Sequence, residues 1–409
     1  MEEPMDEDFT QKLLYTNDKK DLGSISIILL GFTLFLASML SAGALGIELE
    51  FKDFIISVIV GNIILYIYTS LLVYISSHTG LTIYLLSKYS FGEKGSYLVS
   101  ILLGTIQVGW FSVGVAMFAI PLEKITGIPI ITLIMISGML MTIISYYRMK
   151  SLIILGIILI PLFVILGLWS VGISIYDVGG ISNLLQIELK SIGNISNGIS
   201  LCIATFISAT MLFTDFTCYS NNKKTSLRHV ITTVLISIAL MFFFGMIDTM
   251  AIGKFNIFEI IFLQSLMVLV IILLGFNIWF INSNNLERAF LKIRKPLKNK
   301  FVIVNGVMGT LFTIVLYENF LGWLTFLNVS IPNIGAIIIA DYFIINKSKY
   351  TKLQETSLEK VNVIAIISCG AGGLMAYFLD GIAPINAMVF SAIFYTVLTK
   401  MKSKYAINL

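Results

Sequence analysis

The chain has 409 residues, of which 57% are hydrophobic and 12% are charged, and its formal net charge at pH 7 is +4. Soluble globular domains carry about 25% charged residues. Half that fraction, together with a mean hydropathy of +0.94, excludes an ordinary soluble domain and predicts a protein that crosses a membrane many times.

Long apolar runs define the predicted elements. A transmembrane helix needs about 20 apolar residues, and a run such as "IILGIILIPLFVILGLWSVGISI" is too long and too uniformly apolar for the alternating strands of a membrane barrel. We therefore predict an all-α integral membrane protein with twelve transmembrane helices. In chain order the predicted spans are 22–43, 51–75, 96–121, 127–146, 151–175, 196–217, 229–253, 256–284, 301–317, 321–343, 361–379 and 383–400.

The lysines and arginines predict the orientation. With both termini inside, the inner segments hold all 27 of these residues except Lys52, Lys124, Lys190 and Lys254, as the positive-inside rule requires. The acidic leading segment is too long for the charged region of a secretion signal, so residues 1–21 are predicted to be a cytoplasmic tail. We expect the protein in the inner (cytoplasmic) membrane, with its basic loops contacting anionic lipid rather than nucleic acid.

Two spans combine glycine with small polar side chains. They are "LLGFTLFLASMLSAGALG" (29–46) in the first span and "ISLCIATFISATMLFTDF" (199–216) in the sixth, which are corresponding positions in a five-plus-five repeat. Inverted-repeat transporters show this pattern, with discontinuous helices 1 and 6 at the binding site. The alternative is that small residues only let the helices pack closely. The predicted domains are a ten-helix core over 22–345, then a cytoplasmic loop, helices 11 and 12 and a short tail over 346–409.

Polar groups inside two spans indicate a site. In "QVGWFSVGVAMFAIP" (107–121), Gln107 and Trp110 are three residues apart and share a helix face. We expect Gly109 to leave space beside the tryptophan ring. Asn277 lies deep in the eighth span, where an unpaired amide is costly. Its simpler role is a hydrogen bond between helices.

Few residues suit metal or acid–base chemistry. Both histidines fall in predicted inner loops, and the three cysteines are dispersed, so we predict neither an enzyme nor a bound cofactor. A proton relay inside a membrane needs a buried carboxylate. No acidic residue is predicted at the membrane centre, so a relay is not evident from the sequence, and the only candidates are Asp248 and Glu259, toward the outer ends of spans seven and eight. Asp215, at the end of the sixth span, is expected to form a structural ion pair.

Long stretches of the chain match one family. They are "GTIQVGWFSVGVAMFAIP", "GNIILYIYTSLLVYISSHTGLT" (61–82), "SFGEKGS" (90–96), "FISATMLFTDF" (206–216), "GFNIW" (275–279) and "NFLGWLTFLNVSIPNIGAIIIADYF" (319–343). In order and spacing they resemble the bacterial cytosine permeases of the nucleobase:cation symporter family, from about residue 20 to 345. The resemblance implies twelve helices, the first ten forming two inverted five-helix repeats, and transport by alternating access.

The resemblance also implies a binding site. A pyrimidine would stack between Trp110 of the third helix and Phe206 of the sixth, with Phe35 of the first helix closing the pocket. The groups that match the edge-reading positions are Gln107, Thr205, Ser208 and Asn277. Stacking of a base on an aromatic ring contributes about 1–3 kcal/mol, and an unmatched buried donor or acceptor costs about 1–3 kcal/mol.

The implied sodium site departs from the family pattern. Backbone carbonyls of Gly31, Leu34 and Asn277 match sodium ligands, but Phe280 and Ile281 stand where two hydroxyl ligands are expected. Neither side chain offers an oxygen. The coupling ion is therefore left open between Na+ and H+, and uncoupled transport is also open.

The main prediction is a nucleobase transporter, with cytosine as the best single substrate. A hydroxymethylpyrimidine is the first alternative, because related transporters share much of this pocket. A membrane receptor that binds a base without moving it is the second, and an intramembrane enzyme is the weakest. We expect a monomer in the lipid bilayer, with a small-molecule nucleobase as its partner.

Overall fold

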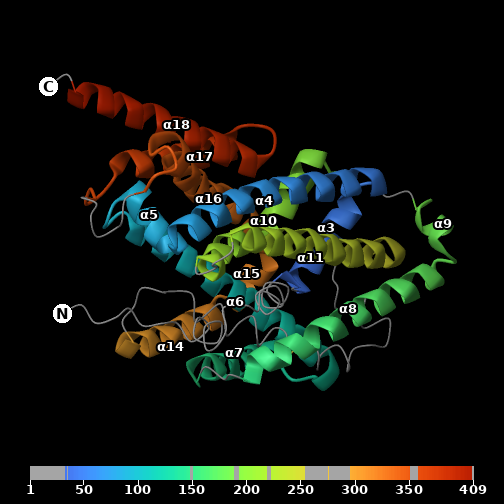
Figure 1. Ribbon diagram of the computed structural model, residues 1–409. Coiled ribbons are helices and arrows are strands. Elements are labelled where there is room, and N and C mark those ends of the chain that lie inside the picture. The colour runs from blue at the N-terminus through green and yellow to red at the C-terminus, as the bar shows by residue number, and fades with distance from the viewer. Residues whose placement is uncertain are drawn as a thin grey trace.

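The computed structural model describes residues 33–34, 36–147, 151–187, 193–218, 223–253, 275, 295–350 and 358–407. Within these ranges the regular structure is entirely helical (Figure 1). The helices are α3 (Leu36–Glu48), α4 (Phe51–Thr79), α5 (Ile83–Phe91), α6 (Ser96–Thr126), α7 (Ile130–Tyr147), α8 (Ser151–Asp177), α9 (Ile181–Leu184), α10 (Ile195–Thr217), α11 (Lys223–Ile252), α14 (Lys295–Leu311), α15 (Thr313–Glu318), α16 (Phe320–Ala340), the π-helix η1 (Asp341–Ile345), α17 (Val363–Phe378) and α18 (Ala383–Ile407).

The all-α prediction is confirmed. Described helices lie over every predicted span except 256–284, of which only Gly275 belongs to the described residues. By length and composition, 6 described helices can cross a membrane, and α7, α14, α17 and part of α8 are shorter apolar helices. The number of twelve crossings stays a prediction.

Helix ends are set by local chemistry. α4, α6 and α11 are each followed by a glycine with positive φ, at Gly80, Gly127 and Gly253, because a left-handed residue after the last turn lets the chain leave the helix. The short helix α5 begins after Thr82, whose hydroxyl accepts from Leu85 N at 3.4 Å. Uninterrupted apolar sequence supports the long helices between these signals.

Two groups of helices pack within themselves. In the first, α4 and α10 pack together, as do α3 and α11, and α4 also contacts α11. We call α3, α4, α10 and α11 the bundle. In the second, α6, α7 and α14 contact one another and α15 contacts α6; we call these four helices the scaffold. Figure 1 shows α4 and α11 across the middle, with α10 crossing behind α4, and α7 and α14 along the lower edge.

The predicted break in the sixth span is wrong. α10 is a continuous helix from Ile195 to Thr217. Its threonine hydroxyls donate to carbonyls of the preceding turn, for example Thr210 to Ile207 O at 2.7 Å and Thr214 to Met211 O at 2.6 Å. Small hydroxyl side chains can be satisfied inside a helix in this way, so they do not require an unwound segment. In the first span, Leu34 is a bend between helical Thr33 and α3.

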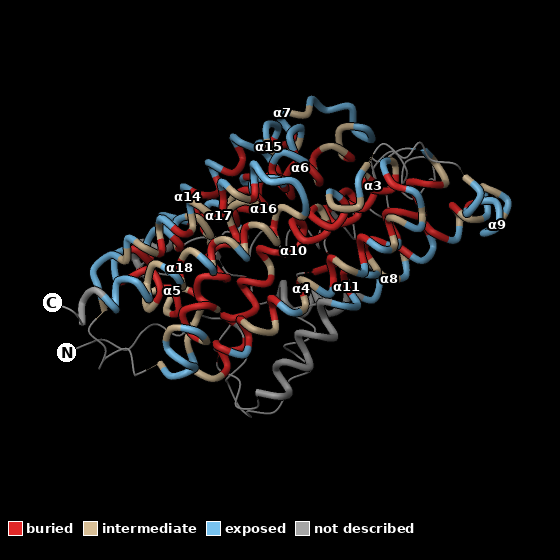
Figure 2. The backbone as a smooth tube through the Cα atoms, turned by 90° about the horizontal axis from the view of Figure 1, so that it is seen from above, coloured by how far each residue is buried: buried red, intermediate tan, exposed pale blue. Residues whose placement is uncertain are grey.

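Buried residues lie in the interior, and large apolar side chains are exposed on the outer helices, as expected for a membrane protein. Buried positions gather where α3, α4, α10 and α16 run through the interior (Figure 2). Large apolar side chains are exposed along the outer helices α7, α8 and α14, among them Ile131, Met139, Trp169 and Leu311. Exposed apolar surface on this scale is stable against lipid rather than water.

The C-terminal helices are attached to the core at one end. α17 and α18 pack on each other and on α16. The carboxylate of Asp341 in η1 accepts from Tyr395 of α18 at 2.6 Å and from Tyr350 at 2.5 Å. Burial, with the neighbouring Asp341 as the next cause, raises the pKa of the Tyr350 phenol well above its usual value, which keeps Tyr350 a donor.

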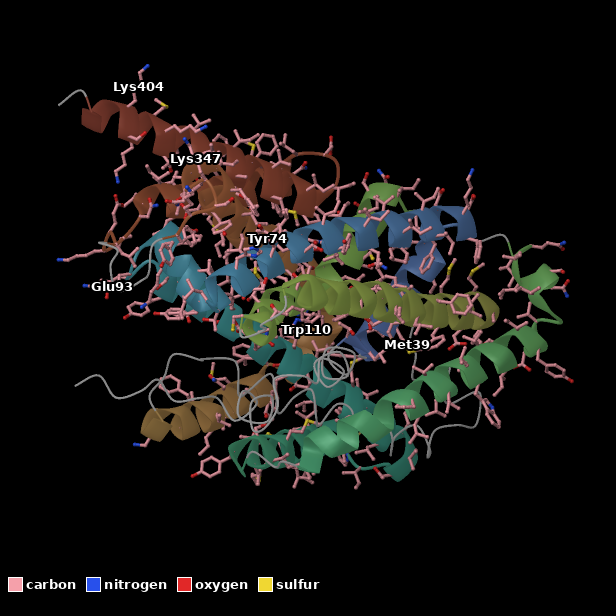
Figure 3. All side chains as sticks on the ribbon, in the orientation of Figure 1. Met39, Tyr74, Glu93, Trp110, Lys347 and Lys404 are labelled. Atoms are coloured by element: carbon pink, nitrogen blue, oxygen red, sulfur yellow. The ribbon has the colours of Figure 1, made fainter. Side chains whose placement is uncertain are left out.

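Predicted inner segments lie at a common end. Glu93, Lys347 and Lys404 lie toward the left in Figure 3, and α9, in a predicted outer loop, lies at the opposite end in Figure 1. Backbone bonds join the loop before α6 to the segment before α17, from Glu93 N to Glu359 O at 2.9 Å and from Lys94 N to Lys360 O at 2.7 Å. This grouping agrees with the predicted topology of these loops.

Candidate functional site

The site prediction brings together residues from the two helix groups. Gln107 and Trp110 lie on α6 of the scaffold, and Thr205, Phe206 and Ser208 lie on α10 of the bundle. All five side chains are buried. Figure 3 shows Trp110 in the middle of the molecule, between the bundle and the scaffold helices.

One hydrogen bond joins the two groups at this point. Trp110 Nε1 donates to Ser208 Oγ at 2.8 Å, and the two side chains are 5% and 4% exposed. The bond fixes the tilt of the indole ring. Ser208 donates to no other group in the part of the chain that the structure describes, so its hydroxyl hydrogen is available to a bound molecule.

Gln107 supplies the amide of the site. Its side chain is 3% exposed and forms no hydrogen bond with a described residue. A glutamine amide offers two donor hydrogens and a carbonyl acceptor, and a buried amide without partners costs free energy. The binding role predicted for Gln107 therefore stays a prediction, with which its buried amide is compatible.

The space at Gly109 is filled by a neighbouring helix, which was not predicted. A Cβ at Gly109 would overlap the six-membered ring of Trp323 in α16, so the glycine lets Trp323 pack on α6 and leaves no gap beside Trp110. Trp110 itself meets Phe320, the first residue of α16, edge-on with ring centroids 6.3 Å apart. Phe320 and Trp323 were not predicted as neighbours of the site, although both lie in the family-like stretch 319–343.

Thr205 and Phe206 of α10 contact different groups within the bundle. The Thr205 hydroxyl donates to Leu201 O at 2.8 Å, which leaves its oxygen as an acceptor. The Phe206 ring lies 6.2 Å from the Phe242 ring of α11, and Phe242 lies 6.3 Å from Phe54 of α4. Phe206 thus begins a row of aromatic rings through the bundle, and its predicted stacking opposite Trp110 stays a prediction.

Several predicted site residues lie outside the described part of the chain. These are Phe35, Gly31, Asn277, Phe280 and Ile281. Leu34 is described and buried, at the bend before α3. Among the described residues, no group of three or more His, Cys, Asp or Glu could hold a metal ion.

A separate cavity lies between α7 and α14. Its volume is about 380 Å³, and its lining includes Met135, Met139, Ile303 and Val307. These side chains are nearly all apolar and belong to the lipid-facing surface of the scaffold. Because it offers almost no polar groups to recognise a ligand, we place the candidate site at Trp110.

The fold and the site define a class: a multi-pass helical membrane protein with an aromatic and amide-lined centre between two helix groups. Residues 22–398 match the family described as permeases for cytosine/purines, uracil, thiamine and allantoin. The chain belongs to this family.

Curated relatives and solved structures agree with this assignment. The chain is 38% identical to the cytosine permease of Escherichia coli (strain K12) over 402 residues, 98% of this chain and 96% of that protein. The cytosine permease of Escherichia coli O157:H7 is also 38% identical over the same share. The fold is similar to Mhp1 in its inward-facing conformation, with a TM-score of 0.79 and 15% identity over 93% of this chain and 90% of that chain. It is also similar to a Na+-coupled sialic acid symporter, with a TM-score of 0.69 and 12% identity over 92% of this chain and 89% of that chain.

Proposed function

We propose that this protein is a secondary transporter that imports a nucleobase, with cytosine as the best single substrate. The 38% identity to a cytosine permease over 98% of the chain supports the substrate class. The observation that carries the mechanism is the Trp110–Ser208 hydrogen bond, because it joins the scaffold to the bundle at a buried site. A ligand held there contacts both groups and can therefore favour one of their arrangements over another.

Recognition would divide between a ring face and a ring edge. A pyrimidine stacks on the Trp110 indole, and each stacked base contributes about 1–3 kcal/mol. The Gln107 amide can both donate to and accept from the polar edge of cytosine, which carries an amino group and a carbonyl. Thr205 and Ser208 add hydroxyls from α10, and Phe206 would cover the second face. Phe35 and Asn277 complete the proposed pocket.

The proposed architecture is the five-plus-five inverted repeat, with two further helices. Contacts between helices recur as the repeat requires: α10 on α4 corresponds to α3 on α11, and α16 on α4 corresponds to α8 on α11. Glycines mark both of the first two crossings, since a Cβ would meet Cys202 of α10 at Gly61 and Met39 of α3 at Gly245. A repeat related by a pseudo-two-fold axis places equivalent helices in equivalent contacts.

The fourth and ninth spans give further support, because they cross each other symmetrically. α7 contains "GMLMT" (138–142) and α14 contains "GVMGT" (306–310). A Cβ at Gly138 would overlap Thr310, and a Cβ at Gly306 would overlap Thr142. Each threonine hydroxyl donates to the glycine carbonyl of its own helix at 2.7 Å. An interface in which each side repeats the other is what a pseudo-two-fold axis through the crossing produces.

Transport would follow from movement of the bundle against the scaffold. The site residues of α6 remain with the scaffold, and those of α10 move with the bundle. The Trp110–Ser208 bond then stretches or reforms in each cycle. A substrate that satisfies Gln107 and Ser208 lowers the cost of that movement.

Sodium fits this chain poorly as the coupling ion. Of the three carbonyl positions, only Leu34 belongs to the described residues. Phe280 and Ile281 provide no side-chain oxygen where the family pattern expects two, and hard cations need oxygen ligands. We derive no transport step through sodium and propose that another ion couples transport.

The proposed location is the inner (cytoplasmic) membrane, with both termini cytoplasmic and the protein acting as a monomer. The distribution of lysines and arginines supports the orientation, as does the common end shared by Glu93, Lys347 and Lys404 in Figure 3.

Counterflow tests the proposed function. Purified protein is reconstituted into liposomes loaded with unlabelled cytosine, uracil or a hydroxymethylpyrimidine, and entry of external labelled cytosine is measured. We expect internal cytosine to accelerate entry most. Faster exchange with the hydroxymethylpyrimidine would move the assignment to that ring, and binding without any exchange would identify a receptor.

A further inference from the structure

A carboxylate lies buried between α8 and α11, away from the Trp110 site. Asp248 of α11 is 0% exposed, and its two carboxylate oxygens accept from Ser170 Oγ and Ser174 Oγ of α8, each at 2.7 Å. The two serines are four residues apart and so lie on one helix face. Together they form a polar clamp around the acid.

No cation balances this acid among the described residues. The helices packed against α11 are α3, α4, α8 and α10, and their titratable side chains other than tyrosine and cysteine are Glu48, Lys52, Asp53, His78, Asp177 and Asp215. None of these forms an ion pair or a hydrogen bond with Asp248. Ionisable groups inside a membrane are costly and usually functional, and a bare buried charge is the costliest form.

The clamp suits both charge states of Asp248. An ionised carboxylate accepts from both serine hydroxyls. A protonated carboxyl donates its O–H to one serine and accepts from the other, because a hydroxyl can act as donor or acceptor. The Asp248 carboxyl group can therefore gain and lose a proton while both of its oxygens stay hydrogen-bonded.

Packing at this interface does not need the acid. One turn earlier, Phe244 of α11 lies over Gly167 of α8. In the corresponding contact between α4 and α16, Tyr68 lies over Gly335, but the next turn of α4 carries Leu72, which is fully buried and apolar. A leucine therefore serves where the acid stands in the other half of the proposed repeat.

The acid lies near the predicted outer end of the protein. Asp248 is four residues from the end of α11, and Ser174 is three residues from the end of α8, which are distances of about 6 Å and about 4.5 Å along a helix. Since α11 belongs to the moving bundle, separation of α8 from α11 would admit water and protons from the outer side.

We propose that Asp248 is the proton-binding site that couples transport to a proton gradient, with Ser170 and Ser174 as its positioning residues. The inference rests on the proposed transport function. Protonation favours the packed α8–α11 interface, because it removes the charge that would otherwise be buried there. The proton enters from the outer side while the interface is open there. It leaves to the cytoplasmic side once movement of the bundle lets water reach the carboxylate from that side, so that each cycle carries one proton inward.

Two measurements test the proposal, and the first does not depend on transport. Infrared spectra of the purified protein are recorded in acidic and alkaline buffers. We expect the protonated-carboxyl absorption in acid to include, beside that of the other Asp and Glu side chains, a band that disappears in alkali and is missing in Asp248→Asn. Identical spectra for the wild type and this variant would overturn the proposal. Glu48→Gln, at the exposed end of α3, is the matched control and should keep the band.

The second measurement separates coupling from transport. In proteoliposomes an inward proton gradient should accelerate cytosine uptake by the wild type severalfold. Asp248→Asn should keep counterflow exchange and lose this acceleration. Ser170→Ala with Ser174→Ala should move the half-maximal pH of the acceleration upward, because those hydroxyls stabilise the ionised form. Wild-type exchange that ignores the proton gradient overturns the proton site and leaves the proposed function standing. Absence of exchange with any base overturns the proposed function, and the infrared result then decides the proton site alone.

Discussion

Replacing Trp110 by alanine removes the stacking face of the candidate site. The indole is 5% exposed, and its Nε1 donates a hydrogen bond of 2.8 Å to Ser208 across the two helix groups. Loss of stacking costs about 1–3 kcal/mol per base. Since a factor of ten in affinity corresponds to about 1.4 kcal/mol, cytosine should bind about 5- to 150-fold more weakly. Trp110→Phe keeps a smaller ring and should lie between the wild type and Trp110→Ala.

Binding is measured by isothermal titration of the detergent-purified protein with cytosine. The matched control is Trp169→Ala on α8, because this tryptophan is 61% exposed on the outer surface. It should leave affinity unchanged. Thermal melting and gel filtration establish that each variant remains folded. A folded Trp110→Ala protein whose affinity lies within about twofold of the wild type, or about 0.4 kcal/mol, would refute the assigned pocket.

Three further predictions concern contacts that hold the helices together. A double-mutant cycle of Trp110→Phe and Ser208→Ala should give a stability coupling of about 0.5–1.5 kcal/mol, as for one buried hydrogen bond; additive melting shifts would contradict that bond. Gly138→Ala should lower the free energy of unfolding by about 1–3 kcal/mol through overpacking at the α7–α14 crossing, whereas a Cβ at Gly172 meets nothing within 4 Å. Equal melting temperatures for Gly138→Ala and Gly172→Ala would refute the close crossing. Tyr395→Phe removes a donor to the buried carboxylate of η1 and should cost about 1–3 kcal/mol in thermal stability; a weaker cytosine affinity with unchanged melting would contradict its structural role.

Much of the fold follows from the apolar runs alone. Continuous runs of about 20 residues leave helices as the only open spanning structure, and described helices lie over the predicted spans outside 256–284. The continuous α10 was not predicted. Small hydroxyl residues such as threonine also occur in unwound transmembrane segments, so the sequence alone does not separate the two cases. Only the structure shows that the Thr210 and Thr214 hydroxyls donate to carbonyls of their own helix.

In the candidate site, too, the sequence predicted contacts within one helix but not the contacts between helices. Gln107 and Trp110 were predicted on one face of α6 because their spacing sets it, and Ser208 was assigned to the same pocket by family resemblance. Its bond to Trp110 depends on how far α6 stands from α10, which no spacing within one helix encodes. The packing of Trp323 into the space at Gly109 likewise depends on how α16 meets α6.

The role inferred for Asp248 depends on its neighbours in the fold. The sequence placed it toward the outer end of a span and named it, with Glu259, as one of two candidates for a proton relay that no pattern made evident. Ser170 and Ser174 lie 78 and 74 residues away in the chain, so no local pattern joins them to it. The fold brings them together because Gly167 lets α8 approach α11 closely.

The most direct test of cytosine transport is uptake of labelled cytosine into proteoliposomes, with sodium and proton gradients imposed separately. We expect saturable uptake that a proton gradient drives and that sodium does not alter, together with loss of high-affinity uptake in Trp110→Ala. Uptake driven by sodium would contradict the proposed coupling and require oxygen ligands from outside positions 280 and 281. No cytosine uptake under any gradient would contradict the central claim.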